Sequence, residues 1–520
     1  MSQLTPFDQV LTHLQDIAPS ALRFSRGIEK EGLRVNDDAH INQNPHPSAL
    51  GSTLTHPHIT TDYSESLLEF ITPVVQNADD VLSFLDESQR FSYQHLGQQY
   101  IWPASMPGVI ENELDVPIAH YGKSNVGTLK HVYRHGLWHR YGRKMQCIAG
   151  LHYNFSVSDE LWQAIADWKG ETLDKDFVSK GYFGLIRNFR RYSWLLLYLF
   201  GASPAVDASF LEGEEHSLEK WDDTTFYGPY ATSLRMSGLG YQNNAQDGLF
   251  VCFNGLPTYT KTLKMAMQQS VPLYETMGVE KEGVYKQLNT NLLQIENEYY
   301  SDVRPKRNSK NGEKPLTALN EHGVEYIEVR CLDLNPFEPL GANRDQINFM
   351  DLFLAYCLLS PSEHLTESEC NEVSENQKRV VMEGRDPAFM LKRHGDDVNL
   401  KDWGQELLNN MTPLAELLDG KNDSHDLKIA LGVMQQRVDN VALTPSAQVL
   451  ASMTQNNQSF SEFALQQAKQ VAEYFSTPVS DERNEHWLNL AQQSDAKQRE
   501  IEAGDNLTFA KYLAEYLLKS

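Results

Sequence analysis

Hydrophobic residues recur at helical spacing at both ends of the chain. Phe7, Val10, Leu11 and Leu14 share one face of a helix, and we therefore predict a short N-terminal helix between residues 5 and 20. The same periodicity returns beyond about residue 345, in residues 348–359, 403–419 and 463–475. Residues 346–520 are thus predicted to form a helical layer.

Between about residues 23 and 345, short segments alternate polar and apolar side chains instead. The candidate strands are residues 27–35, 67–74, 151–157, 248–254, 292–300 and 324–334. This alternation is typical of a sheet with one packed and one exposed face, as antiparallel sheets commonly have. We therefore predict a mixed α/β (α+β) fold with a mainly antiparallel sheet, packed helices and a helical C-terminal third.

The chain has 520 residues, a length that sets about three domains as an upper bound. It contains no internal repeat and no linker rich in Pro, Gly or Ser, so residues 1–520 are predicted to form a single unit. Its longest apolar run, residues 194–202, has about half of the roughly 20 residues that span a membrane. We predict a buried helix there.

Charge and cysteine content narrow the classes of function. The formal net charge of −25 repels phosphate backbones and argues against a nucleic-acid partner. A site for an anionic ligand would need local positive charge, from metal ions or a few placed arginines. The five cysteines include no Cys-x-x-Cys pair, and the first residues do not resemble a signal peptide, so we expect a cytoplasmic protein without a membrane segment.

Two carboxylates lie side by side in the first candidate strand. Because side chains alternate along a strand, Glu29 and Glu31 point to the same face. Neighbouring like charges are unfavourable unless a cation separates them, and clustered oxygens are the ligands that Mg²⁺ prefers. The alternative is an exposed strand edge with two ordinary surface glutamates.

A second acidic segment follows at residues 60–73. Glu69 lies between the apolar pairs Leu67-Leu68 and Phe70-Ile71, where a charged residue is seldom buried without a partner. Asp62 could join it, although a helix cap would explain this residue equally well.

A third segment pairs a carboxylate with a guanidinium. Tyr326, Glu328 and Arg330 share one face of their candidate strand. They could form a salt bridge within the sheet, or a metal ligand beside a phosphate contact, for which the planar fork of arginine is suited. One face of the candidate strand 292–300 is also expected to be polar, through Gln294, Glu296, Glu298 and Tyr300.

Three acidic strand faces and nearby arginines suit two or three Mg²⁺ ions and a nucleoside triphosphate such as ATP. A P-loop is not present, because Pro117 stands where the first glycine before Gly122-Lys123-Ser124 is required. Rossmann glycines, His-Glu-x-x-His and a nucleophile elbow are also missing from the sequence. An ATP site would have to be built in another way.

Many segments together resemble the proteobacterial glutamate-cysteine ligases (γ-glutamylcysteine synthetases). They include RGIEKEGLRV, SESLLEFITP, YGKSNVGTLKHVYRHGLWHRYG, YATSLRMSGLGY, LQIENEYY, VRPKR and VEYIEVRCLDLNPF. The similarity is dense over residues 23–340 and looser beyond. Lys30 and Gly32 depart mildly from the family pattern and are expected to face away from the metals.

The resemblance implies a glutamine-synthetase-like catalytic sheet and the ATP-dependent joining of the γ-carboxylate of L-glutamate to the amine of L-cysteine. The reaction would pass through γ-glutamyl phosphate and begin glutathione biosynthesis. The implied ligands are Mg²⁺, for which Mn²⁺ can substitute, ATP, and glutathione as a feedback inhibitor. The implied oligomeric state is a monomer.

The resemblance also implies roles for individual residues. One metal site would use Glu31, Asp62 and Glu69, and another would use Glu29, His152 and Glu328. Arg330 would be the catalytic arginine on the phosphate, with Arg304 and Lys306 near ATP, although both could equally be solvated surface residues. The cysteine pocket would comprise Tyr133, Gln146, Arg235, Tyr241 and Tyr300.

Two alternatives stay open. A sister carboxylate-amine ligase would share the metal and phosphate residues and use a different amine. A catalytically inactive ATP-binding protein would be expected to lack some of the six proposed metal ligands, all of which the sequence retains.

Overall fold

The core of the protein is a seven-stranded antiparallel sheet with strand order β11-β12-β5-β1-β3-β2, to which β4 adds by pairing with β1. The computed structural model describes residues 5–213, 215–239, 246, 248–309 and 313–518. The strands of this sheet are β1 (Phe24–Val35), β2 (Ile59–Thr61), β3 (Leu67–Ile71), β4 (Tyr100–Ile101), β5 (Leu151–Val157), β11 (Val303–Lys306) and β12 (Tyr326–Leu332).

Helices surround the main sheet, and three smaller sheets lie outside it. The helices are α1 (Pro6–Leu14), α2 (Ala78–Tyr93), α3 (Asn125–Tyr141), α4 (Asp159–Lys169), α5 (Lys175–Phe200), α6 (Leu256–Ala266), α7 (Pro272–Met277), α8 (Pro315–His322), α9 (Arg344–Leu359), α10 (Glu367–Glu383), α11 (Leu400–Asn422), α12 (Asp426–Asp439), α13 (Pro445–Asn456), α14 (Phe460–Tyr474), α15 (Asp481–Gly504) and α16 (Phe509–Leu518). The smaller sheets are formed by β6 (Ala205–Asp207), β7 (Glu219–Lys220) and β8 (Thr225–Tyr227), by β9 (Glu280–Lys281) and β10 (Val284–Tyr285), and by β13 (Met390–Arg393) and β14 (Asp396–Asn399).

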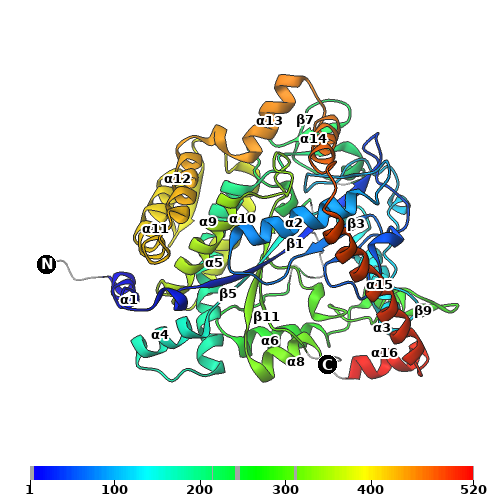
Figure 1. Cartoon of the computed structure of the whole chain (residues 1–520), viewed down its shortest axis with the longest axis horizontal. Coiled ribbons are helices and arrows are strands. Elements are labelled where there is room, and N and C mark those ends of the chain that lie inside the picture. The colour runs from blue at the N-terminus through cyan, green and yellow to red at the C-terminus, as the bar shows by residue number, and fades with distance from the viewer. Residues whose placement is uncertain (1–4, 214, 240–245, 247, 310–312, 519–520) are drawn as a thin grey trace.

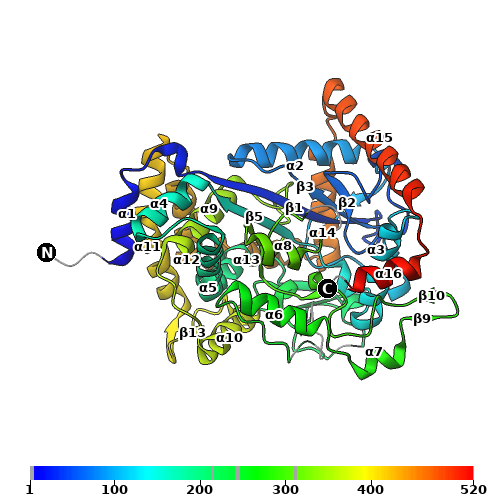
Figure 2. The same ribbon diagram turned by 90° about the horizontal axis from the view of Figure 1, so that it is seen from below.

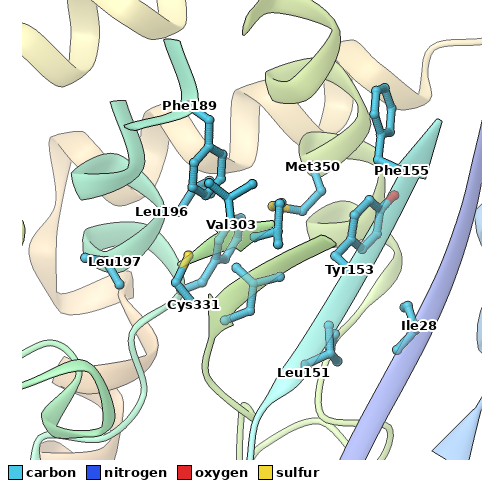
Figure 3. Packing of buried hydrophobic residues seen from close by; sticks show 14 of the residues in the cluster. Ile28, Leu151, Tyr153, Phe155, Phe189, Leu196, Leu197, Val303, Cys331 and Met350 are labelled. Carbon is cyan, nitrogen blue, oxygen red and sulfur yellow. The ribbon is translucent and has the colours of Figure 1, made fainter. Parts of the chain in front are cut away.

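One face of the sheet is packed against α5, α9 and α2. Figure 3 shows apolar side chains of β1 and β5, among them Ile28 and Phe155, facing Phe189 of α5 and Met350 of α9. Polar residues on this face also have partners, since Arg26 pairs with Asp351 of α9 at 2.5 Å. Because neighbours along a strand alternate, the intervening side chains point to the other face.

The C-terminal helices run around the molecule rather than forming a separate layer (Figures 1 and 2). α11 and α12 pack beside α9, α13 and α14 follow, and α15 and α16 return to the opposite side, where α16 contacts α3. Hydrogen bonds connect α15 with the segment after β1, from Ser52 N to Ser494 Oγ at 2.9 Å and from Thr55 Oγ1 to the Ser494 carbonyl at 2.6 Å. A C-terminal helix thereby contacts and stabilises the segment that follows the first strand of the sheet.

Most predicted elements are confirmed. The sheet is antiparallel, the strands at 27–35, 67–74, 151–157 and 324–334 exist with slightly different bounds, and residues 194–200 of the apolar run form the buried end of α5. The predicted N-terminal helix and the helices of the C-terminal third are also present, although β13 and β14 interrupt that third. Within the described residues, no helix is long and apolar enough to cross a membrane.

Two predicted strands are wrong. Residues 248–254 form no strand, and Val251 and Phe253 are buried in the main hydrophobic cluster without pairing with a strand. Residues 292–300 form irregular backbone with a short 3₁₀ helix at Glu296–Glu298. The alternation in both segments reflects packing against neighbouring side chains rather than strand pairing.

Candidate active site

The face of the sheet opposite α5 and α9 borders a cavity of about 580 Å³, which α3 and the segment after residue 294 close from the other side. On each strand, the residues that line the cavity are alternate ones, which point to the same face of the sheet. Its lining includes Glu29, Glu31, Asp62, Tyr63, Glu69, Lys130, Tyr133, Arg134, Tyr141, Gln146, His152, Gln246, Asn297, Glu298, Tyr300, Arg304, Lys306, Glu328 and Arg330.

His152 lies at the centre of the acidic strands. Its Nδ1 atom is 3.3 Å from Glu29 and 3.8 Å from Glu328, and its Nε2 atom is 3.7 Å from Glu31. One ligand atom from each of Glu29, His152 and Glu328 can be chosen so that all three lie within 4.8 Å of one another, a spacing that one cation can bridge. The structure thus brings together the three residues of one expected metal site.

Glu31, Asp62 and Glu69 form the more negative side of the cavity. Glu31 and Glu69 are directly opposite each other in the pairing of β1 with β3. Burial, followed by the charges of Glu29, Asp62 and Glu31, raises the pKa of Glu69 well above its ordinary value. Asp62 lies in the loop between β2 and β3 and not at a helix start, so the helix-cap interpretation is wrong.

The strands β11 and β12 form the positive side. Arg330 Nη1 is 3.1 Å from Glu328 Oε1, and Lys306 Nζ is 3.5 Å from Glu328 Oε2. Although burial alone would raise it, the charges of Lys306 and Arg330 hold the pKa of Glu328 well below its ordinary value. The salt bridge within the sheet therefore exists, and the same two side chains face the cavity.

Arg304 is a buried residue and not a solvated one. Its Nη2 atom donates hydrogen bonds to the backbone carbonyls of Asn297 and Tyr299. Its side chain thereby ties β11 to the irregular segment that replaces the predicted strand 292–300. Lys306, by contrast, is partly exposed at the mouth of the cavity.

The residues expected in the cysteine pocket are only partly brought together. Tyr133 of α3, Gln146 and Tyr300 line the cavity. Arg235 is buried beside it, where Nη2 donates to the Arg330 carbonyl at 2.9 Å. Tyr241 lies outside the described residues.

The glutamates of the segment 292–300 have structural partners. Glu298 accepts hydrogen bonds from Arg140 at 2.9 Å and Tyr141 at 2.5 Å, and the side chains of Glu298 and Arg140 are fully buried. Glu296 accepts from the Leu316 backbone N–H at 3.1 Å. The expected polar face of a strand is therefore a set of buried contacts that shape one wall of the cavity.

Two residues that contact proposed metal ligands were not predicted. Arg134 donates to the Asp62 carbonyl at 2.6 Å, and Asn154 donates to Glu29 at 3.0 Å, so both hold proposed metal ligands in place. Lys130, Tyr133 and Arg134 occur at helical spacing on α3, and this spacing was the signal in the sequence that they share a face.

Gly122-Lys123-Ser124 precedes this helix, and Ser124 accepts a hydrogen bond from the Gly127 N–H as its N-cap, so the run is not a phosphate loop.

The cavity thus combines the five carboxylates and the imidazole of the proposed metal sites with three cationic side chains on β11 and β12. Oxygen-rich donors fit hard divalent cations, and the pKa of Glu69 is raised first by burial and then by the neighbouring carboxylates, a repulsion that a bound cation would relieve. The donor set therefore fits Mg²⁺, and its carboxylates also suit Mn²⁺.

Comparison with known proteins agrees with this geometry. The model of the glutamate-cysteine ligase family matches residues 11–380. The chain is 51% identical to the glutamate–cysteine ligase of Pseudomonas putida over 492 residues, which are 94% of each chain. It is 50% identical to that of Alcanivorax borkumensis over 508 residues, 96% of this chain and 97% of the relative.

Solved structures agree as well. The crystal structure of glutamate–cysteine ligase from Francisella tularensis in complex with AMP superposes with a TM-score of 0.90 at 34% identity, covering 96% of this chain and 98% of that one. A bifunctional glutathione synthetase from Pasteurella multocida, at 23% identity and a TM-score of 0.63, shares the fold. The chain belongs to the glutamate-cysteine ligase family.

Proposed function

We propose that this protein joins the γ-carboxylate of L-glutamate to the amine of L-cysteine at the expense of ATP, through γ-glutamyl phosphate, in the first step of glutathione biosynthesis. The observation that carries the proposal is the convergence of all six expected metal ligands and Arg330 in one cavity of a chain that belongs to this family.

Two groups of ligands would hold the metal ions. Glu29, His152 and Glu328 would form one group, whose ligand atoms one cation can bridge. Glu31, Asp62 and Glu69, which line the same cavity, would form the other. Magnesium bound there would neutralise the charge of the ATP phosphates and of the reacting carboxylate. The chain's own contribution is to fix these donors, through Gly150 N–H to Glu31 at 2.6 Å and Asn154 to Glu29 at 3.0 Å.

Arg330 is proposed as the catalytic group for phosphoryl transfer. Its guanidinium faces the cavity beside Glu328 and His152, where it can bind a phosphoryl oxygen as negative charge develops. Lys306 lies next to it and offers a second positive charge at the cavity mouth. Arg304 lines the same cavity while its Nη2 atom binds backbone carbonyls, so its fixed guanidinium would add positive charge beside the phosphates.

Cysteine would bind near Tyr133, Gln146 and Tyr300, with Arg235 supporting the site from beside the cavity. Tyr241 belongs to the same proposal, which rests for this residue on the family resemblance. The five free cysteines fit a cytoplasmic protein. The proposal also includes one catalytic unit, 1–520, that acts on small molecules as a monomer and is inhibited by glutathione; the monomer and the inhibition rest on the family resemblance.

The test is ATP hydrolysis with Mg²⁺ and glutamate in the presence of cysteine, 2-aminobutyrate, ammonia or no amine, with the products identified by mass. Phosphate release that requires both amino acids and gives γ-glutamylcysteine is the expected result. Activity with another amine only would favour a sister ligase, and no turnover with any amine would favour an inactive ATP-binding protein.

A further inference from the structure

Helix α3 carries histidines at every fourth position, 131, 135 and 139, on a face that does not line the catalytic cavity. His131 and His135 are adjacent in space, with their two Nε2 atoms 3.1 Å apart and their ring planes inclined at 71°. Both residues are partly exposed, so ions in solution can reach this face.

The tautomer of His131 follows from its other nitrogen. His131 Nδ1 lies 2.8 Å from the Ala119 carbonyl, which can only accept a hydrogen bond, so Nδ1 carries the proton. In the neutral ring Nε2 is then a bare lone pair, and it points at His135. A backbone carbonyl that holds the distal N–H is the usual support of a metal-binding histidine, because it fixes both the tautomer and the ring orientation.

The spacing of the two nitrogens fits a single metal ion. Two imidazoles on a tetrahedral ion, each about 2.0–2.1 Å from it, place their nitrogens roughly 3.3 Å apart. Histidines four residues apart on a helix are a recurrent chelating pair for this reason. In the metal-free protein, one proton between the two Nε2 atoms forms a hydrogen bond instead.

The surroundings keep both rings in the neutral form that binds metals. Burial, followed by the neighbouring His131 and His139, lowers the pKa of His135 to about 4. Burial also lowers the pKa of His131, and His120 stacks on its ring with the centroids 4.1 Å apart. The neighbouring Arg143 is engaged with the face of Trp138, 3.7 Å from the ring centroid, and with the Val116 carbonyl.

We propose that His131 and His135 form a second metal site, separate from the catalytic cavity, for a divalent transition ion of the Zn²⁺ or Ni²⁺ class. The ion takes the place of the proton between the two Nε2 atoms, His135 then carries its proton on Nδ1, and water completes the coordination. Mg²⁺ is excluded because it requires oxygen ligands, which distinguishes this site from the carboxylate sites.

The test is calorimetric titration of the whole protein with Zn²⁺ in the presence of saturating Mg²⁺. Wild type is compared with His135→Gln, His131→Gln and the control His139→Gln, which removes a histidine of the same helix face that is not one of the pair. X-ray absorption of the zinc-loaded protein counts the imidazole ligands. Unfolding of each variant without metal establishes that its fold is intact.

We expect one Zn²⁺ equivalent whose affinity falls by about 10- to 100-fold in His135→Gln and in His131→Gln, a loss typical of a disturbed ligand set, and is kept in His139→Gln. If zinc bound at Cys252, Cys370 or the catalytic carboxylates instead, its affinity would be the same for wild type and the three variants. Unchanged affinity in His135→Gln overturns the proposal, and so does an equal loss in all three variants.

Discussion

Two glutamates of one cavity differ in pKa because their neighbours differ. Burial raises the pKa of both side chains. Lys306 and Arg330 outweigh it at Glu328 and hold that pKa well below the ordinary value, whereas three other carboxylates add to it at Glu69, whose pKa lies well above. A cavity that ends in positive charge on one side and surplus negative charge on the other can orient a nucleotide whose phosphates are bridged by cations.

The surplus charge leads to a prediction for Glu69→Gln. Without divalent ions, the substitution removes a buried, repelled carboxylate and should raise the free energy of unfolding by about 0.5–2 kcal/mol, the range that single stabilising substitutions commonly reach. With substrates present, the Mg²⁺ concentration for half-maximal activity should rise about 10-fold or more. Urea unfolding in EDTA and magnesium titration of activity measure the two effects.

The exposed surface residue Glu500 on α15 provides the matched control, as Glu500→Gln. It should change neither quantity. A Glu69→Gln protein that is less stable than wild type in EDTA would contradict the interpretation of Glu69 as an uncompensated metal ligand.

Arg330→Ala tests the positive side of the cavity. Loss of one preorganised charge-stabilising donor typically lowers the rate by roughly 10²- to 10³-fold, and we expect kcat to fall by this factor. Steady-state kinetics with ATP, glutamate and cysteine give the measurement. Arg307→Ala is the control, because Arg307 lies one residue beyond the strand and donates to the Gly323 carbonyl instead of facing the cavity. Equal losses in the two variants would argue against a role of Arg330 in phosphoryl transfer.

At the residue scale, the sequence predicted the site where strand periodicity applies. Glu29 with Glu31, and Glu328 with Arg330, share a face because alternate residues in a strand must do so. Arg134 and Asn154 were missed because their roles are to hold other residues across the fold. That Arg304 is used on backbone carbonyls follows from its burial, which the charged run Arg304-Pro305-Lys306-Arg307 does not reveal.

At the element scale, the sequence could not separate strands from irregular segments with the same alternation. Residues 292–300 alternate because Glu296 and Glu298 each have a buried partner from elsewhere in the chain, Leu316 and Arg140. A strand needs a neighbour to pair with, and the neighbours of β12 are already β5 and β11. Strand pairing depends on distant segments, so the local periodicity of a sequence cannot predict it.

The C-terminal helix α16 acts on the site through α3. Leu513 of α16 is buried with Leu129 and Val132 of α3 and with Leu288, and Tyr133, which lines the cavity, packs against this cluster. The element farthest along the chain therefore helps to position a wall of the proposed cysteine pocket.

We predict that Leu513→Ala lowers kcat/KM for cysteine more than it lowers global stability. The cavity left behind loosens α16 and α3, and misplacement of a positioning group by about 1 Å can cost up to about 10²-fold in rate. A terminal helix unfolds locally, so the melting temperature should barely change. Leu518→Ala, on the same helix but 84% exposed, should be silent in both assays. A drop in melting temperature without a kinetic effect would show that α16 only stabilises the fold.

At the scale of the whole molecule, contacts between distant parts of the chain enclose the sheet. Near the start of α15, Trp487 is fully buried against Phe84 and Phe91 of α2, and its Nε1 donates to Glu87 at 2.6 Å. The loop before β2 joins this contact through His56, whose ring lies parallel to that of Trp487. The N-terminal half of the sheet and the C-terminal helices thus share one buried junction.

This junction should be sensitive to acid. His56 Nδ1 accepts hydrogen bonds from the backbone N–H groups of His58 at 3.1 Å and Ile59 at 2.8 Å, and protonation would break both. Burial, followed by His58, lowers the pKa of His56 to about 4. In the unfolded chain His56 has a pKa of about 6.5, so below that pH it binds a proton there but not in the native protein. The free energy of unfolding therefore falls as the pH drops from about 6.5 to about 4.

His56→Asn isolates this contribution, because the asparagine Oδ1 can accept the same backbone N–H groups and does not titrate. Near pH 7 the variant loses some packing against Trp487 and should be somewhat less stable than wild type. Towards pH 4.5 the difference should shrink or reverse, since wild type alone pays a protonation penalty of about 2 kcal/mol. Urea unfolding of both proteins between pH 7 and pH 4.5 measures it. Parallel stability curves would mean that His56 is protonated in the native protein, and that the junction between the sheet and α15 tolerates its charge.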